Sequence, residues 1–395
     1  MENELIYLDY CATTPVHPQA LQDMLPFFNE HFGNASSIYH KWGRKAAEAI
    51  DDARNQVADA IHASTKEIIF TSGATEAINQ ALKGIWTHYH TLGKHIITCT
   101  TEHPAVLDTC KYLENQGATI TYLPVDQQGN ISLDDLENAI RADTILIALM
   151  LANNETGVIH PVKAVGELAR KHRILFFCDA TQAIGKIPVN VEELNIDLMA
   201  ISAHKCYGPK GIGALYIRRR STPIQVGSLL NGGKQENKLR AGTLNVPAIV
   251  GFGTAIHLTQ QLLVEKAREI EKLRNDLEGQ LLTIPESFVN GIQASRLPHV
   301  SNIGFKYVKS AELMGCLPRL ALSSGSACAT GSLDPSHVLL AMGMETNDAH
   351  SCIRISLGNP TTKQELIEAS QLIRQAVEKL RSDSPIWQMH EAGLL

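Results

Sequence analysis

The sequence predicts an α/β protein built on a largely parallel sheet with helices on both faces. Between about residue 65 and residue 220, short apolar runs alternate with segments of helical character. The runs at residues 144–150 and 174–178 are almost continuously apolar, which is typical of strands buried on both faces. The length of 395 residues allows two domains with sizeable cores.

The other elements follow in order along the chain. In the first part, strands are expected at residues 67–71, 95–99 and 195–201, with helices over residues 74–88 and from residue 104. A long helix is expected over much of residues 246–282, where it bridges two domains. A smaller α+β domain is indicated by strands at residues 302–307 and 353–357 and a helix over residues 361–382.

Composition and charge exclude several classes of protein. With 44% apolar and 19% charged residues, the chain is an ordinary globular sequence. The formal net charge of −6 gives no basic footprint, so we expect no direct nucleic-acid contact. Three arginines at residues 218–220 are expected at a solvated strand end. Because residues 1–4 do not resemble a signal peptide and no apolar stretch approaches the ~20 residues that span a bilayer, we expect a cytoplasmic protein without membrane contact.

The eight cysteines are scattered and form no close CxxC pair. This pattern fits a reducing compartment and argues against a disulfide framework or a structural zinc site. No group of His, Cys and Asp residues has the spacing of metal ligands, so we expect no bound metal. Most of the thiols are expected to pack as small apolar side chains.

Lys205 is the first candidate for chemistry. It follows a predicted strand in the run Ser202-Ala203-His204-Lys205, just before a glycine-rich stretch. Lysine is rarely buried unless it is paired or reactive, and an amine of lowered pKa is the usual partner of a carbonyl in a Schiff base. Lys205 therefore indicates pyridoxal phosphate, although such a tetrapeptide is also common in ordinary polar turns.

The other needs of this cofactor have candidates at neighbouring strand ends. Asp179 could sit beside the pyridine nitrogen, although a lone Asp is more often a cap. Residues 72–76, Ser-Gly-Ala-Thr-Glu, open a helix whose amides suit a phosphate, and Ser202 and His204 could add donors. Simple capping explains residues 72–76 equally well. His103 could stack on a flat ring and move protons, but lone histidines are more often structural.

Residues 323–332 are small except for one thiol, Cys328. Such a run cannot build a core, so a mobile surface loop is expected. An exposed thiol in a flexible loop suits a nucleophile or redox group better than it suits packing. An incidental exposed cysteine is less favoured, because exposed free thiols are a liability.

Together these segments resemble a cysteine desulfurase of the NifS/IscS type, within the class V aminotransferase group. The resemblance extends from residues 8–15 to residues 353–358 and rests on seven motifs in order: Ser72-Gly73-Ala74-Thr75-Glu76, Thr101-Glu102-His103, Asn153-Asn154-Glu155-Thr156-Gly157, Asp179-Ala180-Thr181-Gln182, Ser202-Ala203-His204-Lys205, Arg240-Ala241-Gly242-Thr243 and residues 323–328.

The resemblance implies fold type I of the pyridoxal-phosphate-dependent transferases, with a mainly parallel seven-stranded sheet. It implies a large cofactor-binding domain over residues 15–255. A small α+β domain is then formed by residues 1–14 and 256–395, with the cysteine loop at about residues 323–333.

The resemblance also implies a role for each matching residue. Lys205 holds the cofactor and moves the substrate α-proton, and Cys328 is the nucleophile that takes the sulfur. Asp179 pairs with the pyridine nitrogen and His103 stacks on the ring. The remaining contacts are Ala74, Thr75, Ser202 and His204 to the phosphate, Asn154 and Gln182 to the phenolic oxygen side of the ring, Thr243 from the neighbouring subunit, and Asn34 and Arg354 to the substrate carboxylate.

The implied reaction gives L-alanine and a persulfide on Cys328 from L-cysteine. A homodimer with shared sites is implied, as is transfer of sulfur to acceptor or scaffold proteins for iron–sulfur cluster assembly or other thiolation. The acceptor, including DNA or tRNA thiolation, and a transient iron–sulfur contact at Cys328 stay open. The alternatives are a selenocysteine lyase, a cystine lyase, an aminotransferase, or an idle scaffold. Cys11 and Asn359 depart from the residues common in the family.

Overall fold

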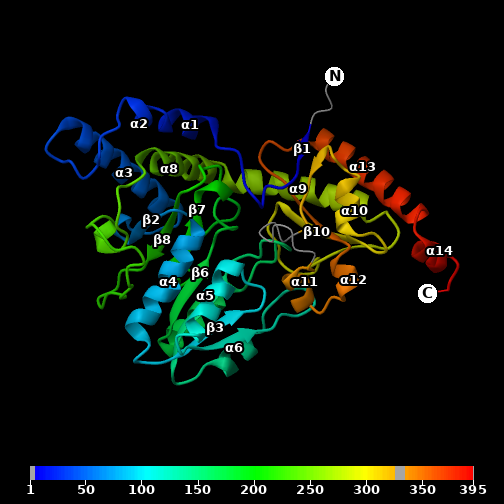
Figure 1. The fold of residues 1–395 in the computed structure, drawn as a ribbon, viewed down its shortest axis with the longest axis horizontal. Coiled ribbons are helices and arrows are strands. Elements are labelled where there is room, and N and C mark those ends of the chain that lie inside the picture. Colours follow the sequence, from blue (N-terminus) through cyan, green and yellow to red (C-terminus); the bar gives the residue numbers. More distant parts are fainter. Residues whose placement is uncertain (1–4, 325–333, 395) are drawn as a thin grey trace.

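The main sheet has seven strands within residues 5–324 and 334–394, which are the residues that the computed structural model describes (Figure 1). The strand order is β2-β8-β7-β6-β5-β3-β4. β8 is antiparallel to both neighbours and the other pairs are parallel, which confirms the prediction of a mainly parallel sheet. The strands are β2 (Ile68–Thr71), β3 (His95–Cys99), β4 (Thr119–Leu123), β5 (Thr144–Met150), β6 (Leu175–Asp179), β7 (Leu198–Ser202) and β8 (Gly213–Ile217).

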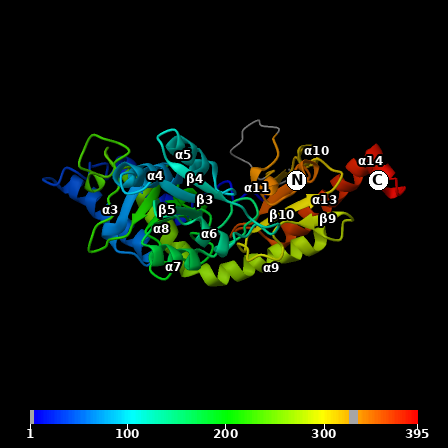
Figure 2. The ribbon, with the colours of Figure 1, turned by 90° about the horizontal axis from the view of Figure 1, so that it is seen from below.

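Helices cover both faces of this sheet (Figure 2). One apolar core lies between the strands and the helices α4 (Ala74–Tyr89) and α5 (Pro104–Glu114). The core on the opposite face joins the strands to α3 (Lys41–Ala60), α7 (Val162–His172) and α8 (Val246–Gln261). Because both faces are covered, β5 and β6 are buried at every position, as their apolar sequences predict. α6 (Leu133–Ala139) adds Leu136 to this second core, and α1 (Pro18–Met24) and α2 (Pro26–Asn29) lie outside these layers.

A third apolar core lies around a smaller, antiparallel sheet. Here β10 (Val300–Phe305) pairs with β9 (Ser287–Val289) and β12 (Cys352–Ser356), and Ile6 and Leu8 join from the amino-terminal end. β1 (Ile6–Tyr7) pairs with β11 (Leu320–Ala321). The helices of this part are α9 (Leu263–Leu281), α10 (Ser310–Gly315), α11 (His337–Ala341), α12 (Thr346–Ala349), α13 (Lys363–Ser382) and α14 (Pro385–Glu391). The domain bounds stay a prediction.

The single long helix expected over residues 246–282 is wrong in one respect, because the structure divides it into α8 and α9. The break is at Leu262, whose backbone angles (φ −114°, ψ 9°) lie outside the helical region. α8 packs on α1 and α3, whereas α9 packs on α13. Each half therefore follows a different core, and helical spacing alone does not reveal that change of partner.

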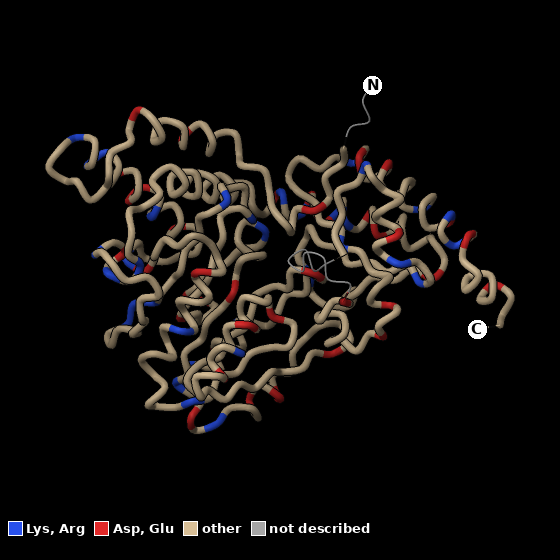
Figure 3. Tube along the Cα trace, viewed as in Figure 1, with Lys and Arg blue, Asp and Glu red and all other residues tan. Residues whose placement is uncertain are grey.

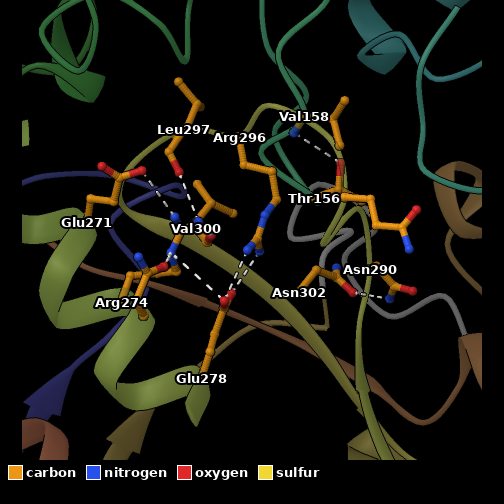
Figure 4. A network of polar contacts seen from close by, with 12 residues as sticks. Thr156, Val158, Glu271, Arg274, Glu278, Asn290, Arg296, Leu297, Val300 and Asn302 are labelled. Atoms are coloured by element: carbon orange, nitrogen blue, oxygen red, sulfur yellow. Dashed lines mark hydrogen bonds and ion pairs between the residues drawn. The ribbon is translucent and has the colours of Figure 1, made fainter. Parts of the chain in front are cut away.

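Buried ion pairs fix the segment that leads into β10 (Figure 4). Arg274 of α9 donates to the carbonyl oxygens of Leu297 (3.4 Å) and Val300 (3.2 Å). Glu278, one turn further along α9, accepts two hydrogen bonds from Arg296, at 2.7 and 3.0 Å. The segment between Arg296 and Val300 is thus anchored to α9 at both of its ends.

Basic and acidic residues are interspersed along the described chain (Figure 3). The expectation of a solvated arginine run at residues 218–220 is wrong for Arg218, which is 6% exposed. Arg218 donates to the carbonyl of Val191 and pairs with Glu192 at 2.7 Å. The run is therefore partly a buried anchor of β8. Among the described residues, no helix has both the length and the apolar character needed to cross a bilayer.

Candidate active site

The carboxyl ends of five strands meet at one edge of the main sheet, where they form a cavity of about 700 Å³. This edge is where parallel sheets place their ligands. Arg354 of β12 and residues near α11 close the cavity from the smaller sheet. The sequence-predicted residues that line it are Ala74, Thr75, His103, Asn154, Asp179, Gln182, Ser202, His204, Lys205 and Arg354.

Lys205 lies in the turn that follows β7. Its Nζ donates hydrogen bonds to the carbonyl oxygens of Cys11 (2.5 Å) and Ala12 (2.8 Å). Two main-chain acceptors from the amino-terminal segment therefore orient the amine at the cavity wall. The position suits a lysine that joins a carbonyl ligand.

The start of α4 provides an anion cradle at the cavity wall. Gly73, which precedes the helix, has φ +153°, and no side chain of the described residues caps the first amides of α4. A Cβ on Gly73 would meet Ser202 Oγ at 3.9 Å and otherwise lie in open space. The uncapped amides, the helix dipole and the adjacent hydroxyls of Thr75 and Ser202 fit a phosphate group.

The Glu76 carboxylate beside this cradle forms an ion pair with Arg240. Glu76 accepts from the backbone N–H of Ser72 (2.7 Å) and pairs with Arg240 (2.9 Å). Although burial by itself raises the pKa of Glu76, the hydrogen bonds from Arg240 and Ser72 bring that pKa below its ordinary value. The ionised Glu76 is thus balanced by Arg240, which limits its repulsion of a phosphate. The sequence motif contained both residues but did not show that they pair.

His204 lies on the same wall, and its Nδ1 is 3.2 Å from Thr13 Oγ1. Burial, together with the charges of Lys205 and Lys210, lowers the pKa of His204 to about 4. The ring is therefore neutral near pH 7, so it contributes a hydrogen bond to an anion and no positive charge.

Asp179 ends β6 and is 5% exposed. Its Oδ1 accepts from the backbone N–H of Thr181 (2.9 Å) and from Thr181 Oγ1 (2.5 Å). Both donors belong to Thr181, which lies two residues after Asp179, so the turn that follows β6 orients the carboxylate. An acid held rigidly at the cavity wall fits the nitrogen of a pyridine ring.

His103 caps the first turn of α5, where its Nδ1 accepts from the backbone N–H of Ala105 at 3.1 Å. In the neutral ring the proton is then on Nε2, which leaves that edge able to donate. The ring lines the cavity. It can therefore stack on a flat ligand and exchange protons there.

Two buried acids close to the cavity were not singled out from the sequence. Glu102 accepts from the backbone N–H of Met150 at 2.5 Å, and Glu155 accepts from Ser336 Oγ at 2.5 Å. Burial raises the pKa of both carboxyl groups above the ordinary value. Both residues belong to the motifs named above, but the residues around them in the sequence do not indicate that their carboxyl groups are buried.

Arg354 reaches the cavity from β12 and is 2% exposed. It donates to Asp9 Oδ1 (2.8 Å) and to the carbonyl oxygen of Asn154 (2.9 Å). Gln182 donates to the carbonyl of Cys11 at 3.1 Å. These contacts join the two sheets around the cavity and hold a guanidinium where a carboxylate ligand could bind.

Three predicted residues are not brought to this cavity by the described part of the chain. Thr243 and Asn34 are exposed and do not line it. Cys328 and the rest of residues 325–333 lie outside the described residues. Asp334 and Pro335, which follow them, do line the cavity. The roles assigned to Thr243, Asn34 and Cys328 stay predictions.

Cys178 and Cys206, which adjoin Asp179 and Lys205 in the sequence, are buried. Burial raises the pKa of Cys206 to about 12 and raises that of Cys178 well above its ordinary value. Both are therefore thiols at neutral pH, which suits packing and not nucleophilic attack.

Comparisons with known proteins agree on one family. The family model "Aminotransferase class-V" matches residues 6–368. The chain is 48% identical to "Cysteine desulfurase IscS" of Haemophilus influenzae (strain PittGG) over 391 residues, which cover 98% of this chain and 96% of that protein. The solved structure "NIFS-LIKE PROTEIN" has a TM-score of 0.89 at 36% identity and covers 95% of this chain and 99% of its own. "SspA in complex with cysteine" has a TM-score of 0.79 at 36% identity and covers 89% and 98%.

Proposed function

The chain belongs to the class-V aminotransferase family, and we propose that it is a cysteine desulfurase that binds pyridoxal 5'-phosphate in the cavity described above. The observation that carries the proposal is the convergence of an amine, an acid, an imidazole and an uncapped helix start on one cavity. These are the groups that this cofactor requires, and relatives named cysteine desulfurase match nearly the whole chain.

Each residue of the cavity has a distinct task in holding the cofactor. Lys205 Nζ would provide the covalent link, Asp179 would pair with the pyridine nitrogen, and His103 would stack on the ring. The amides of α4, with Thr75, Ser202 and His204, would hold the phosphate, and Asn154 and Gln182 would contact the phenolic oxygen side; all of these residues line the cavity. When bound, the cofactor withdraws electrons from the α-carbon of the amino acid.

The residues of this chain then position L-cysteine and move protons and sulfur. Arg354, oriented by Asp9 and Asn154, binds the substrate carboxylate. Lys205 Nζ takes the α-proton and His103 exchanges protons with the substrate. The Cys328 thiolate attacks the substrate sulfur, and the carbon–sulfur bond breaks as the carbon gains a proton. The products are L-alanine and a persulfide on Cys328.

The experiment compares two variants of the purified protein after addition of pyridoxal phosphate. Cys328→Ala should keep the absorbance of lysine-bound cofactor and lose alanine formation from L-cysteine by about 100-fold or more. Lys205→Ala should lose both the absorbance and the activity. Alanine and sulfide production by Cys328→Ala at the wild-type rate would reject the nucleophile assignment. Absence of any cofactor absorbance in the wild-type protein would reject the proposed function itself.

The proposal extends to a homodimer in which Thr243 completes the partner's phosphate site. The segment from the end of α1 to the first turn of α3 exposes large apolar side chains, as monomers rarely do. They are Leu25, Phe28, Phe32, Ile38, Tyr39 and Trp42, from 54% to 94% exposed. Asn34 lies in the same segment and would come close to a partner when this surface is covered. These observations support an assembled active site with contributions from two subunits.

We also propose that the persulfide sulfur passes to acceptor or scaffold proteins in the cytoplasm, with iron–sulfur cluster assembly as the first destination. The relatives named IscS support this choice. Mass spectrometry of Cys328 in the labelled protein, before and after each candidate acceptor is added, identifies the partner that removes the sulfur.

A further inference from the structure

A second, small cavity lies behind the candidate active site, where the start of α9 meets residues 185–186 and 298–299. Its volume is about 70 Å³, which is room for one small ion or a few water molecules. Lys186, His299, Lys266 and Asn359 supply most of its polar lining, and its described lining includes no Asp or Glu. No step of the proposed reaction uses this cavity.

Lys186 is the most unusual side chain in its wall. It is 5% exposed, and its Nζ has no hydrogen-bond partner among the described residues. The ammonium lies 4.6 Å from the centre of the Tyr207 ring, and no described carboxylate pairs with it. Burial lowers the pKa of Lys186 to about 8, so the amine still carries its charge near pH 7. Burying a charge without a counter-charge costs free energy, and a bound anion would lower that cost.

His299 provides a second nitrogen without a described partner. The ring is fully buried, its Nε2 is 3.5 Å from Cys11 Sγ, and its Nδ1 bonds to no described residue. Burial, with the charge of Lys186, holds the pKa of His299 well below its ordinary value, so the ring is neutral. When the thiol of Cys11 donates to Nε2, the ring proton is on Nδ1. His299 then presents an N–H donor.

The frame around these two groups is rigid. His299 lies between Arg296 and Val300, the segment that Arg274 and Glu278 anchor to α9 (Figure 4). Lys266, which also lines the cavity, pairs with Glu269 at 2.7 Å. Leu262, another lining residue, is 51% exposed, so the cavity lies close to the protein surface.

We propose that Lys186 and His299 form a buried binding site for one monovalent inorganic anion of halide size. The two groups supply one positive charge and one neutral donor beside a cavity of about 70 Å³, which suits one small ion of single negative charge. A metal ion is disfavoured, because the lining carries two lysines and no carboxylate. The site does not depend on the proposed function. It lies next to the active site, because the Cys11 that contacts His299 also accepts a hydrogen bond from Lys205.

The test uses bromide as the probe with crystals of the cofactor-loaded protein. Crystals soaked in sodium bromide and measured at the bromine absorption edge should give an anomalous peak within hydrogen-bond distance of Lys186 Nζ. Soaks of Lys186→Met crystals should give none, whereas Lys266→Met crystals should keep the peak. Absence of a peak in the wild-type protein, or an equal peak in Lys186→Met, overturns the proposal.

A solution measurement distinguishes a real site from binding at crystal concentration only. The melting temperature is followed as sodium gluconate is replaced by sodium chloride or bromide at constant ionic strength. The wild-type protein should show a saturable increase, and Lys186→Met should bind the halide about tenfold or more weakly. Equal responses in both proteins, or no halide response in the wild type, would mean that the crystal peak is binding at crystal concentration only and would overturn the site. Sodium sulfate should produce no saturable increase, because the single charge of Lys186 does not balance a divalent ion.

Discussion

At the residue scale, burial decides which ionisable groups of this protein are charged. His160, which follows the turn after β5, is 3% exposed, and neither of its ring nitrogens has a partner among the described residues. Burial lowers the pKa of His160 to about 4. Folding therefore keeps this ring neutral at pH values where the unfolded chain binds a proton.

This difference predicts how stability depends on pH. The unfolded state binds more protons than the folded state between about pH 6.5 and pH 4, so stability is lost as the pH falls through that range. From pH 7 to pH 5, His160 should contribute a loss of about 2 kcal/mol in the free energy of unfolding. Urea unfolding of the wild type, His160→Gln and His160→Asn at both pH values measures it. Either variant keeping the full wild-type pH dependence would contradict the assignment.

Strand ends made the main site residues predictable. Asp179, His103 and Lys205 each follow a recognisable apolar run, and parallel strands bring such ends to one edge. What the pattern could not supply was the orientation of each group. The hydrogen bonds from Thr181 to Asp179 depend on turn geometry. Those from Lys205 Nζ to the carbonyl oxygens of Cys11 and Ala12 depend on contacts between residues far apart in sequence.

At the element scale, α9 is the support for the segment that leads into β10. Glu278 is buried and lies between two buried guanidinium groups, those of Arg274 and Arg296. Removing one partner of a buried ion pair leaves an uncompensated charge, which costs more than the pair contributes. The loss of the Glu278 carboxylate would therefore destabilise the fold by more than the ion pairs themselves stabilise it, because it would leave two buried arginines without their shared partner.

Glu278→Ala should lower the free energy of unfolding by about 3 kcal/mol, because both arginines then lack their shared carboxylate. Chemical denaturation measures the change. Asp276→Ala, on the exposed side of the same helix, is the matched control and should stay within about 0.5 kcal/mol of the wild type. Equal stability of the two variants would show that α9 holds the segment through apolar packing alone.

The division of the expected long helix shows the limit of periodicity. Residues on either side of Leu262 keep helical spacing, yet α8 packs on α3 and α9 packs on α13. A helical pattern specifies which residues share a face, but it does not specify which element will cover that face. The boundary therefore depended on tertiary contacts that the sequence pattern does not contain.

At the scale of the whole molecule, the cavity draws on distant parts of the chain. Cys11, the ends of β2, β3, β5, β6 and β7, and Arg354 of β12 converge on it, so it forms only when both sheets are assembled. Thr243 and Asn34 fall outside it, and both are exposed. A family resemblance assigned them to the site, whereas one folded chain does not bring them there. The proposed homodimer would account for this difference, and sequence alone cannot show which subunit supplies a residue.

Complementation between two inactive variants tests that explanation. Lys205→Ala lacks the covalent link, and Thr243→Ala has a weakened phosphate site, so each homodimer should form alanine slowly when cofactor is limiting. If Thr243 acts across the interface, one of the two sites in a mixed dimer combines an intact Lys205 with an intact Thr243. Activity after subunit exchange should then rise toward about a quarter of the wild-type value, since about half of the dimers are mixed and each has one intact site. No rise in a mixture shown by mass spectrometry to contain mixed dimers would place Thr243 in the site of its own chain or outside both sites.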